Sequence, residues 1–274
     1  MAIQYYGSTI KKNTQMFITI FMIDKTEEGR YTHVFTDRMQ KSIDYVEKVF
    51  TDNYTVVDQL SELMGVNKNK FSVHYQPADI SSIAASKDTI ENRFKKPPLK
   101  VLWAGRLDRQ KRPDIFIQIA DKASRMDMAV EFYAYGSPAF EDNSYLKALE
   151  NSTHITYGGG YTGGLKSLPL QNFDVFLMTS EWEGMPNVLL EAIVAGLLPI
   201  APHVGGVAEI IINGKTGILI EHYNDIDSYI ESLSAVGSME RPQKLIHEAQ
   251  ALVLERHTQE KYEERISKEK AYLS

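Results

Sequence analysis

Apolar residues in the first third of the chain follow two kinds of pattern. Residues 16–23 (MFITIFMI) form a continuous apolar, β-branched and aromatic run, which is typical of a strand buried on both faces. Residues 38–49 carry apolar positions at helical spacing, and residues 54–64 resume that spacing up to Gly65, a suitable helix C-cap. Residues 71–75 predict a further short strand. The long apolar run favours a parallel sheet.

A charged connector follows at residues 91–98 (ENRFKKPP) and closes in two prolines. Proline fixes its own backbone angle and lacks an N–H donor, so such a pair interrupts regular structure and stiffens a connector. We therefore expect a domain boundary here, with one domain over residues 1–96 and a second over residues 97–274.

Beyond the connector, short apolar runs alternate with segments of helical spacing. Such alternation predicts a βαβ series, in which helices cover both faces of a mostly parallel sheet and ligands gather at the carboxyl ends of the strands. The loops after the strands are therefore expected to carry the chemistry. Strands are predicted at residues 100–104, 129–135, 155–157, 174–179, 198–201 and 217–220, and helices at 113–124, 143–150, 187–195, 225–236 and 240–272, the last divided near 255–258.

Composition narrows the class of protein without naming it. The chain has 274 residues, of which 43% are hydrophobic and 24% charged, as in soluble globular proteins of one large or two smaller domains. The absence of cysteine excludes disulfides, thiolate metal sites and cysteine nucleophiles. A formal charge of −6 gives no general attraction for nucleic acid. With no signal-peptide pattern at the start, we expect a cytoplasmic protein.

The first candidate site is the loop Gly105-Arg106-Leu107-Asp108-Arg109-Gln110-Lys111-Arg112-Pro113, between a predicted strand and a helix that proline can open. Phosphate groups bind at this position in α/β sheets. Arg106 and Lys111, five residues apart, can reach one pyrophosphate, and each charge-assisted bond contributes about 1.5–3 kcal/mol when desolvated. A solvated basic loop is the alternative.

A second loop, residues 180–192, again runs from a predicted strand through Gly184 into a helix that Pro186 and Asn187 suit as a start. The helix N-terminus offers free N–H groups to an anion. Glu191, one turn inside, would repel phosphate and so suits a ribose diol, and Glu183 lies nearer a sugar. Ordinary surface charge is the alternative interpretation for the two glutamates.

These segments together resemble a known family. Glu183 and Glu191 form an E-x7-E pattern inside EGMPNVLLEAIVAG, with GRLDRQKRP upstream and GGVAEIIINGKTGILI downstream. The chain is similar to family 4 retaining glycosyltransferases of the GT-B fold (glycosyl transferases group 1), well over residues 99–272 and weakly over 46–80. The resemblance implies an α/β protein whose Rossmann-like C-terminal domain is preceded by a partial Rossmann-like N-terminal domain.

The resemblance implies transfer of a sugar from a nucleotide diphosphate donor of the UDP or GDP type. Arg106 and Lys111 match the pyrophosphate-binding pair, which would stabilise the charge on the leaving diphosphate without a bound metal. Glu183 would contact the donor sugar. Retention in this family is described as attack on the face that the diphosphate leaves, so no protein nucleophile is needed.

The remaining donor contacts follow from the same match. Glu191 is expected to bind the ribose, while N–H groups near Gly184 approach the phosphates and the segment from Gly158 to Tyr161 lies along the base. A core tyrosine followed by a turn glycine is the alternative for Tyr135 and Gly136. The implied donor-binding residues are Gly105, Tyr135, Gly136, Gly158, Gly184, Met185, Pro186, Asn187 and Glu191.

The chain departs from the family at its start. Only about 95 residues precede the expected boundary, whereas the family's N-terminal domain is about twice as long and carries an early glycine-rich loop and the acceptor site. The segment MAIQYYGSTI supplies neither. The expected acceptor is a saccharide or a lipid-linked saccharide of polysaccharide, lipopolysaccharide or glycolipid assembly, with soluble or peripheral-membrane behaviour. A truncated chain and one part of a split enzyme both stay open.

Two other classes of function compete. The first is a nucleotide-sugar-binding module without turnover, completed by a missing or separate N-terminal segment. The second is a nicotinamide-dependent oxidoreductase, which the sequence disfavours because no G-x-G-x-x-G follows a first strand with an acidic residue about 20 positions later. Seven histidines are scattered without metal-ligand spacing.

Overall fold

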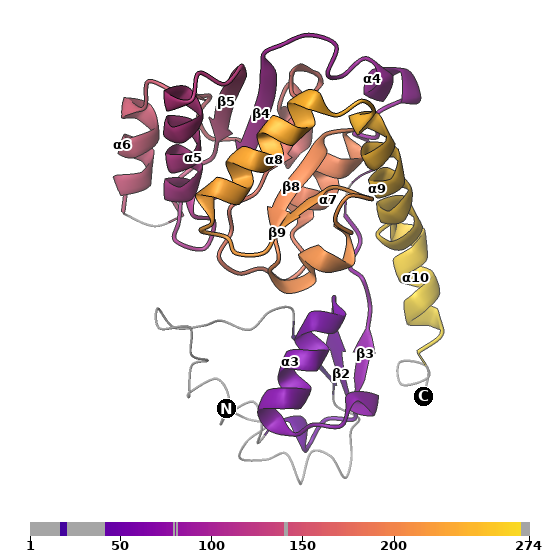
Figure 1. Cartoon of the computed structure of the whole chain (residues 1–274). Coiled ribbons are helices and arrows are strands. Elements are labelled where there is room, and N and C mark those ends of the chain that lie inside the picture. Colours follow the sequence, from indigo (N-terminus) through magenta and orange to yellow (C-terminus); the bar gives the residue numbers. More distant parts are fainter. Residues whose placement is uncertain (1–16, 21–41, 79, 81, 140–141, 270–274) are drawn as a thin grey trace. The chain divides into compact units, whose positions relative to one another are not determined.

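The computed structural model describes residues 17–20, 42–78, 80, 82–139 and 142–269. The chain divides into two compact units. The small unit comprises Met1–Pro77 with Gln259–Ser274, and the large unit comprises Ala78–Thr258. Figure 1 colours both along the sequence. None of the helices in the described part of the chain is both long and apolar enough to cross a membrane.

Within its described residues, the small unit contains a three-stranded parallel sheet of order β1-β2-β3. Its strands are β1 (Phe17–Thr19), β2 (Lys48–Thr51) and β3 (Phe71–Val73), with α3 (Tyr54–Met64) and the 3-10 turn η1 (Lys68–Lys70) between the last two. Helix α3 begins where the Asn53 side chain accepts the Val56 N–H, and it ends at Gly65, whose φ of 63° confirms the predicted C-cap. Val49 and Leu60 are fully buried in the core of this unit.

One predicted helix of the small unit is wrong over most of its described length, because only residues 42–43 are helical and residues 44–47 form turns and irregular backbone. Helical spacing was expected over residues 38–49, but Lys48–Thr51 is strand β2, and Val49 pairs with Ile18 and Phe71. The apolar residues here fit both the helical and the strand period. Strand β2 forms because it pairs with a strand on each side. Residues 38–41, like residues 16 and 21–23 of the predicted first strand, lie outside the described residues.

The large unit is built on six parallel strands in the order β6-β5-β4-β7-β8-β9. This is the Rossmann order, in which the chain first adds strands on one side of β4 and then returns to add strands on the other. The carboxyl ends of β4 and β7 therefore flank the topological switch point, where such sheets bind ligands. The strands are β4 (Leu99–Ala104), β5 (Val130–Tyr135), β6 (Ile155–Tyr157), β7 (Val175–Leu177), β8 (Leu198–Pro202) and β9 (Ile218–Ile220).

Helices cover both faces of this sheet. Right-handed crossovers in opposite directions along the sheet place α5 and α6 on one face and α7 on the other. Helix α8 packs beside α5, and α9 packs beside α7 (Figure 1). The helices are α5 (Pro113–Arg125), α6 (Ser144–Asn151), α7 (Asn187–Val194), α8 (Ile226–Ser238) and α9 (Pro242–Arg256), with α10 (Gln259–Ser267) in the small unit and 3-10 turns η2 (Leu165–Ser167), η3 (Leu170–Asn172) and η4 (Gly205–Glu209).

The structural boundary lies about 20 residues before the expected one at residues 96 and 97. Helix α4 (Lys87–Glu91) belongs to the large unit, because its Ile90 is fully buried in that unit's core. Arg93 is also buried and donates to the carbonyls of Leu170, Phe173 and Ala195. The connector is thus part of the fold that it precedes.

The C-terminal helical segment divides as predicted, between α9 and α10. Helix α10 belongs to the small unit, in which the Arg265 guanidinium lies 5.1 Å from the ring centre of Tyr75. The Ser72 hydroxyl donates to Glu269 at 2.6 Å. The last helix thus packs with the N-terminal part of the chain.

Candidate functional site

The candidate site is formed by the loops that leave the carboxyl ends of β4 and β7, on either side of the switch point. Residues 105–112 connect β4 to α5, and residues 178–186 connect β7 to α7. The buried Thr179 side chain joins the two loops: it accepts the Trp103 indole N–H at 3.0 Å and donates to the Lys111 carbonyl at 2.8 Å. The backbone N–H of Glu181 donates to the Gln110 carbonyl at 2.8 Å.

Lys111 and Glu183 form an ion pair across this junction. Lys111 Nζ lies 2.5 Å from Glu183 Oε1, and the side chains are only 16% and 6% exposed. Water screens such a pair weakly, so the interaction is strong but each charge has lost much of its hydration. An anion or a hydroxyl group that enters here meets a charged donor and a charged acceptor that are already in place.

Arg106 lies on the solvent side of the same pair. Its side chain is 57% exposed, yet it bonds Asp108 at 3.0 Å and donates to Gln110 Oε1 at 2.6 Å. Gln110 in turn donates to the Trp182 carbonyl at 3.0 Å and to Glu183 Oε2 at 3.5 Å. Arg106, Gln110 and Glu183 therefore form one connected network that spans both loops.

A second charged cluster flanks this network. Glu181 lies 3.2 Å from Arg112 and 3.5 Å from Arg109. Hydrogen bonding to Asp114, with smaller contributions from the Asp114 charge and from a hydrogen bond to Glu181, raises the pKa of Arg112 above its usual value. The Arg109 guanidinium lies 5.8 Å from the Trp182 ring centre. These contacts join the loop after β4 to the loop after β7.

Gly105, Gly136 and Gly158 directly follow the neighbouring strands β4, β5 and β6, and the last two have no room for a side chain. A Cβ on Gly136 would lie 1.9 Å from the Gly105 carbonyl oxygen, and one on Gly158 would lie 2.1 Å from the Tyr135 ring. Both clashes are closer than any real Cβ contact, so only glycine fits. The Tyr135 ring also lies edge-on to Phe173, at 6.3 Å. Tyr135 and Gly136 thus serve packing at this edge.

Glu191 lies one turn into α7, as predicted, and contacts a different loop. Its Oε2 accepts the Leu165 N–H at 2.6 Å. A Cβ on Gly164, whose φ is 82°, would lie 3.0 Å from the same oxygen. Burial and the Glu191 charge raise the pKa of Tyr161 to about 12, so this phenol stays protonated near neutral pH. Glu191 therefore holds the glycine-rich loop after β6 against α7.

The start of α7 and the η4 turn complete the edge. Gly184, Met185 and Pro186 are buried, and the helix begins at the exposed Asn187 without a side-chain cap. The Gly206 N–H donates to the Gly184 carbonyl at 2.8 Å. Gly205 has a φ of 51°, and a Cβ there would lie 2.0 Å from the Glu183 carbonyl oxygen.

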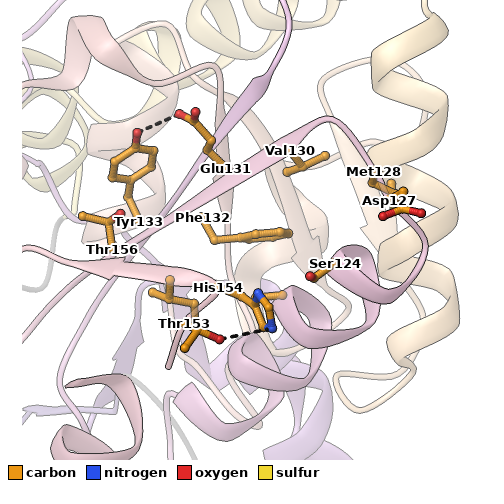
Figure 2. A pocket seen from close by; sticks show the side chains of 12 residues that line it. Ser124, Asp127, Met128, Val130, Glu131, Phe132, Tyr133, Thr153, His154 and Thr156 are labelled. Carbon is orange, nitrogen blue, oxygen red and sulfur yellow. Dashed lines mark hydrogen bonds between the residues drawn. The ribbon is translucent and has the colours of Figure 1, made fainter. Parts of the chain in front are cut away.

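A cavity of about 560 Å³ lies elsewhere, at the amino ends of β5 and β6 (Figure 2). It is lined by side chains such as Asp127, Glu131 and His154, and by none of the predicted site residues. Its polar contacts are local: Tyr133 donates to Glu131 at 2.8 Å, and Thr153 lies 3.3 Å from His154.

The structure joins Arg106, Lys111 and Glu183 and places Glu191 against a separate loop. Sequence reasoning missed Gln110 and Thr179, whose roles depend on contacts about 70 residues away along the chain. Gln110 stands inside the basic motif, so its position was a usable signal; nothing marked Thr179. Among the described residues, no group of three or more His, Asp or Glu side chains could hold a metal ion.

The strand order and the GT-B-like structural neighbours define the class: an α/β protein of the GT-B type, with a Rossmann-like unit that carries charged loops at the switch point. The family model for glycosyl transferases group 1 matches residues 85–252. The chain belongs to this family.

Individual relatives agree with this assignment. An uncharacterized 41.2 kDa protein in the cps region of Klebsiella pneumoniae is 27% identical over 174 residues, which cover 62% of this chain and 47% of that protein. D-inositol 3-phosphate glycosyltransferase of Paenarthrobacter aurescens is 23% identical over 69% of this chain and 48% of its own length. Anabaena HepE in complex with UDP superposes with a TM-score of 0.78 at 16% identity, over 99% of this chain and 76% of that one. The chain thus spans about half the length of the curated relatives it matches.

Proposed function

We propose that this chain binds a nucleotide diphosphate sugar at the carboxyl edge of the large unit's sheet and transfers the sugar, with retention, to a saccharide or lipid-linked acceptor. The observation that carries the proposal is the buried Lys111–Glu183 pair at the switch point. Membership of glycosyl transferases group 1 supports it, as does the UDP bound in the HepE structure. The product fits a surface polysaccharide or a related glycan.

Each charged side chain has a role that its surroundings favour. Arg106, exposed and anchored by two neighbours, and Lys111 neutralise the diphosphate as the glycosidic bond breaks. Glu183, held by Lys111 and Gln110, accepts hydroxyl groups of the donor sugar. The acceptor oxygen attacks the anomeric carbon on the face that the diphosphate leaves, and a diphosphate oxygen takes its proton.

The nucleoside half of the donor is assigned to the loop after β6. A carboxylate accepts several hydrogen bonds, so Glu191 can hold the Leu165 N–H and also accept from a ribose diol. The loop that contains Gly158 and Tyr161 then lies along the base. The phosphates are assigned to the backbone near Gly184 and Met185, at the start of α7, where the positive end of the helix dipole favours an anion.

A donor-binding module without turnover is the second candidate. It is favoured by one observation, that the chain spans about half the length of its curated relatives. In that case an N-terminal portion supplied from elsewhere would complete the acceptor site, and the present chain would bind nucleotide sugar without consuming it.

Calorimetric titration with UDP, GDP, ADP and NAD tests donor binding, with Lys111→Met and Glu191→Gln as site variants. Exposed Lys215→Met and Glu231→Gln serve as matched controls that remove the same charges elsewhere. We expect one diphosphate to bind and both site variants to weaken it. Equal binding by the site variants and controls, or preference for NAD, would reject the assignment.

Turnover separates the two candidates. The chain is incubated with the sugar form of the preferred nucleotide, and release of free diphosphate is followed with and without saccharide acceptors. Release by the chain alone supports the transferase, and proton NMR of the product reports whether the anomeric configuration is retained. Binding without release supports the donor-binding module.

A further inference from the structure

Gln110 occupies the centre of the charged network, although neither motif marks it as functional. Its side chain is buried, and its amide contacts both loops of the site. Oε1 accepts from Arg106 at 2.6 Å, while Nε2 donates to the Trp182 carbonyl at 3.0 Å and to Glu183 Oε2 at 3.5 Å. It is therefore bonded to one residue of the proposed diphosphate site and to one of the proposed sugar site.

The chemistry of the partners fixes the direction of this amide. A guanidinium can only donate hydrogen bonds, and a backbone carbonyl can only accept them. Turning the amide over would set its NH2 group against Arg106 and its oxygen against the Trp182 carbonyl, so that both contacts become repulsive. Gln110 therefore has one stable orientation, which ties the position of Arg106 to that of Glu183.

We propose that Gln110 is a positioning residue that holds Glu183 in place when a diphosphate draws Lys111 away from it. This inference rests on the proposed function. In the free chain Lys111 binds Glu183 Oε1, whereas Gln110 binds the other oxygen and the preceding carbonyl. When Lys111 turns to phosphate, those two bonds keep the Glu183 carboxylate directed at the sugar. The Oε1 atom of Gln110 meanwhile holds Arg106 at the diphosphate.

Gln110→Glu separates this role from simple packing. The new side chain has the same shape and still offers an oxygen to Arg106, but its second oxygen faces the Trp182 carbonyl and the Glu183 carboxylate. The change therefore disturbs the sugar side most, while its added negative charge beside Arg106 also weakens diphosphate binding. Gln110→Met keeps the length of the side chain but loses the hydrogen bonds to Arg106, to the Trp182 carbonyl and to Glu183. Gln118→Glu, the same change at an exposed position of α5, is the matched control.

Calorimetry on the full 274-residue chain measures diphosphate binding and sugar binding separately. The Kd of UDP is compared with those of UDP-glucose and UDP-N-acetylglucosamine, and the Kd of GDP with that of GDP-mannose. For Gln110→Glu we expect the diphosphate Kd to rise by up to about tenfold, because the new carboxylate lies beside Arg106, and the nucleotide-sugar Kd to rise by at least about a further tenfold. Gln110→Met weakens both. Equal loss of both ligands, or of neither, for Gln110→Glu overturns the inference.

Thermal unfolding of the free chain gives a second readout. Gln110→Glu is expected to lower Tm by about 5 °C, and adding Glu183→Gln restores part of that loss, because the contact between two carboxylates is removed while the new oxygen still faces the Trp182 carbonyl. No restoration overturns the inference. If the wild-type chain binds none of the probes, the proposed function fails and the role of Gln110 with it, whereas wild-type binding with an unaltered ligand ratio in Gln110→Glu overturns the inference alone.

Discussion

The two edges of the six-stranded sheet differ in how their polar groups are bonded. At the amino edge, the cavity of Figure 2 is lined by side chains whose bonds join residues one or two positions apart, such as Tyr133 with Glu131. At the carboxyl edge, Lys111 and Glu183 are 72 positions apart and almost buried. The first arrangement forms whenever the local chain folds, while the second exists only when the whole sheet is assembled.

This difference explains why the volume of a cavity does not by itself identify the candidate site. Exposed side chains around an open cavity keep their hydration, and replacing water with a ligand gains little. Buried charges that are held by the fold have already lost that hydration and are oriented before a ligand arrives. The following variants test whether the carboxyl edge alone carries function.

The largest effect is expected for Lys111→Met, which keeps the length of the side chain but removes its charge. Glu183 then stays buried without its cation, which costs about 3 kcal/mol of unfolding free energy. Diphosphate affinity falls at least about 100-fold, since the closest phosphate partner is lost. Denaturant unfolding and calorimetry measure the two effects.

The double variant Lys111→Met/Glu183→Gln is the control for this change. It removes the unpaired charge, so most of the stability returns while binding stays weak. Binding that recovers together with stability would show that Lys111 acts on the fold and not on the ligand.

Gly205→Ala is expected to have the next largest effect. The new Cβ would lie 2.0 Å from the Glu183 carbonyl oxygen, so the loop that carries Glu183 must move. Gly214→Ala shares the positive φ but meets no atom within 4 Å, so it reports backbone strain alone, about 1 kcal/mol. We expect Gly205→Ala to cost about 2 kcal/mol more and to weaken diphosphate binding. Equal unfolding free energies for the two variants would contradict the close approach.

Glu191→Gln is expected to have a moderate effect on binding. The amide oxygen can still accept the Leu165 N–H, so stability changes by less than about 1 kcal/mol. The charge-assisted bond to a ribose diol is lost, and nucleotide affinity falls about tenfold. Comparing UDP with ribose-free diphosphate localises the effect: a loss for pyrophosphate as large as that for UDP would place Glu191 at the phosphates instead.

The smallest effect is expected at the amino edge. Thr153→Trp places a large side chain in the cavity of Figure 2 from an exposed position. Because this cavity contains none of the site residues, diphosphate affinity should stay within about twofold of wild type. A tenfold loss in calorimetry, with the Tm unchanged, would mean that the two edges are coupled.

The sequence predicted the features that local patterns determine. The strand before Gly105, the helix that starts at Asn187 and the place of Glu191 within it all follow from periodicity and helix-start chemistry. Strand β2 was missed because its neighbours, and not its own pattern, define it. Gln110 was missed for the same reason, since its partners Trp182 and Glu183 lie on another loop.

The buried contacts of Arg93 determine where a separately produced large unit can begin. A version that starts at the proline pair, residues 97 and 98, would leave the carbonyls of Phe173 and Ala195 without their buried donor and would remove Ile90 from the core, while the Leu170 carbonyl would keep the Phe173 N–H. Each buried carbonyl without a partner costs about 1–3 kcal/mol, so the two together remove a large share of the stability of a domain. A recombinant large unit should therefore begin near residue 78.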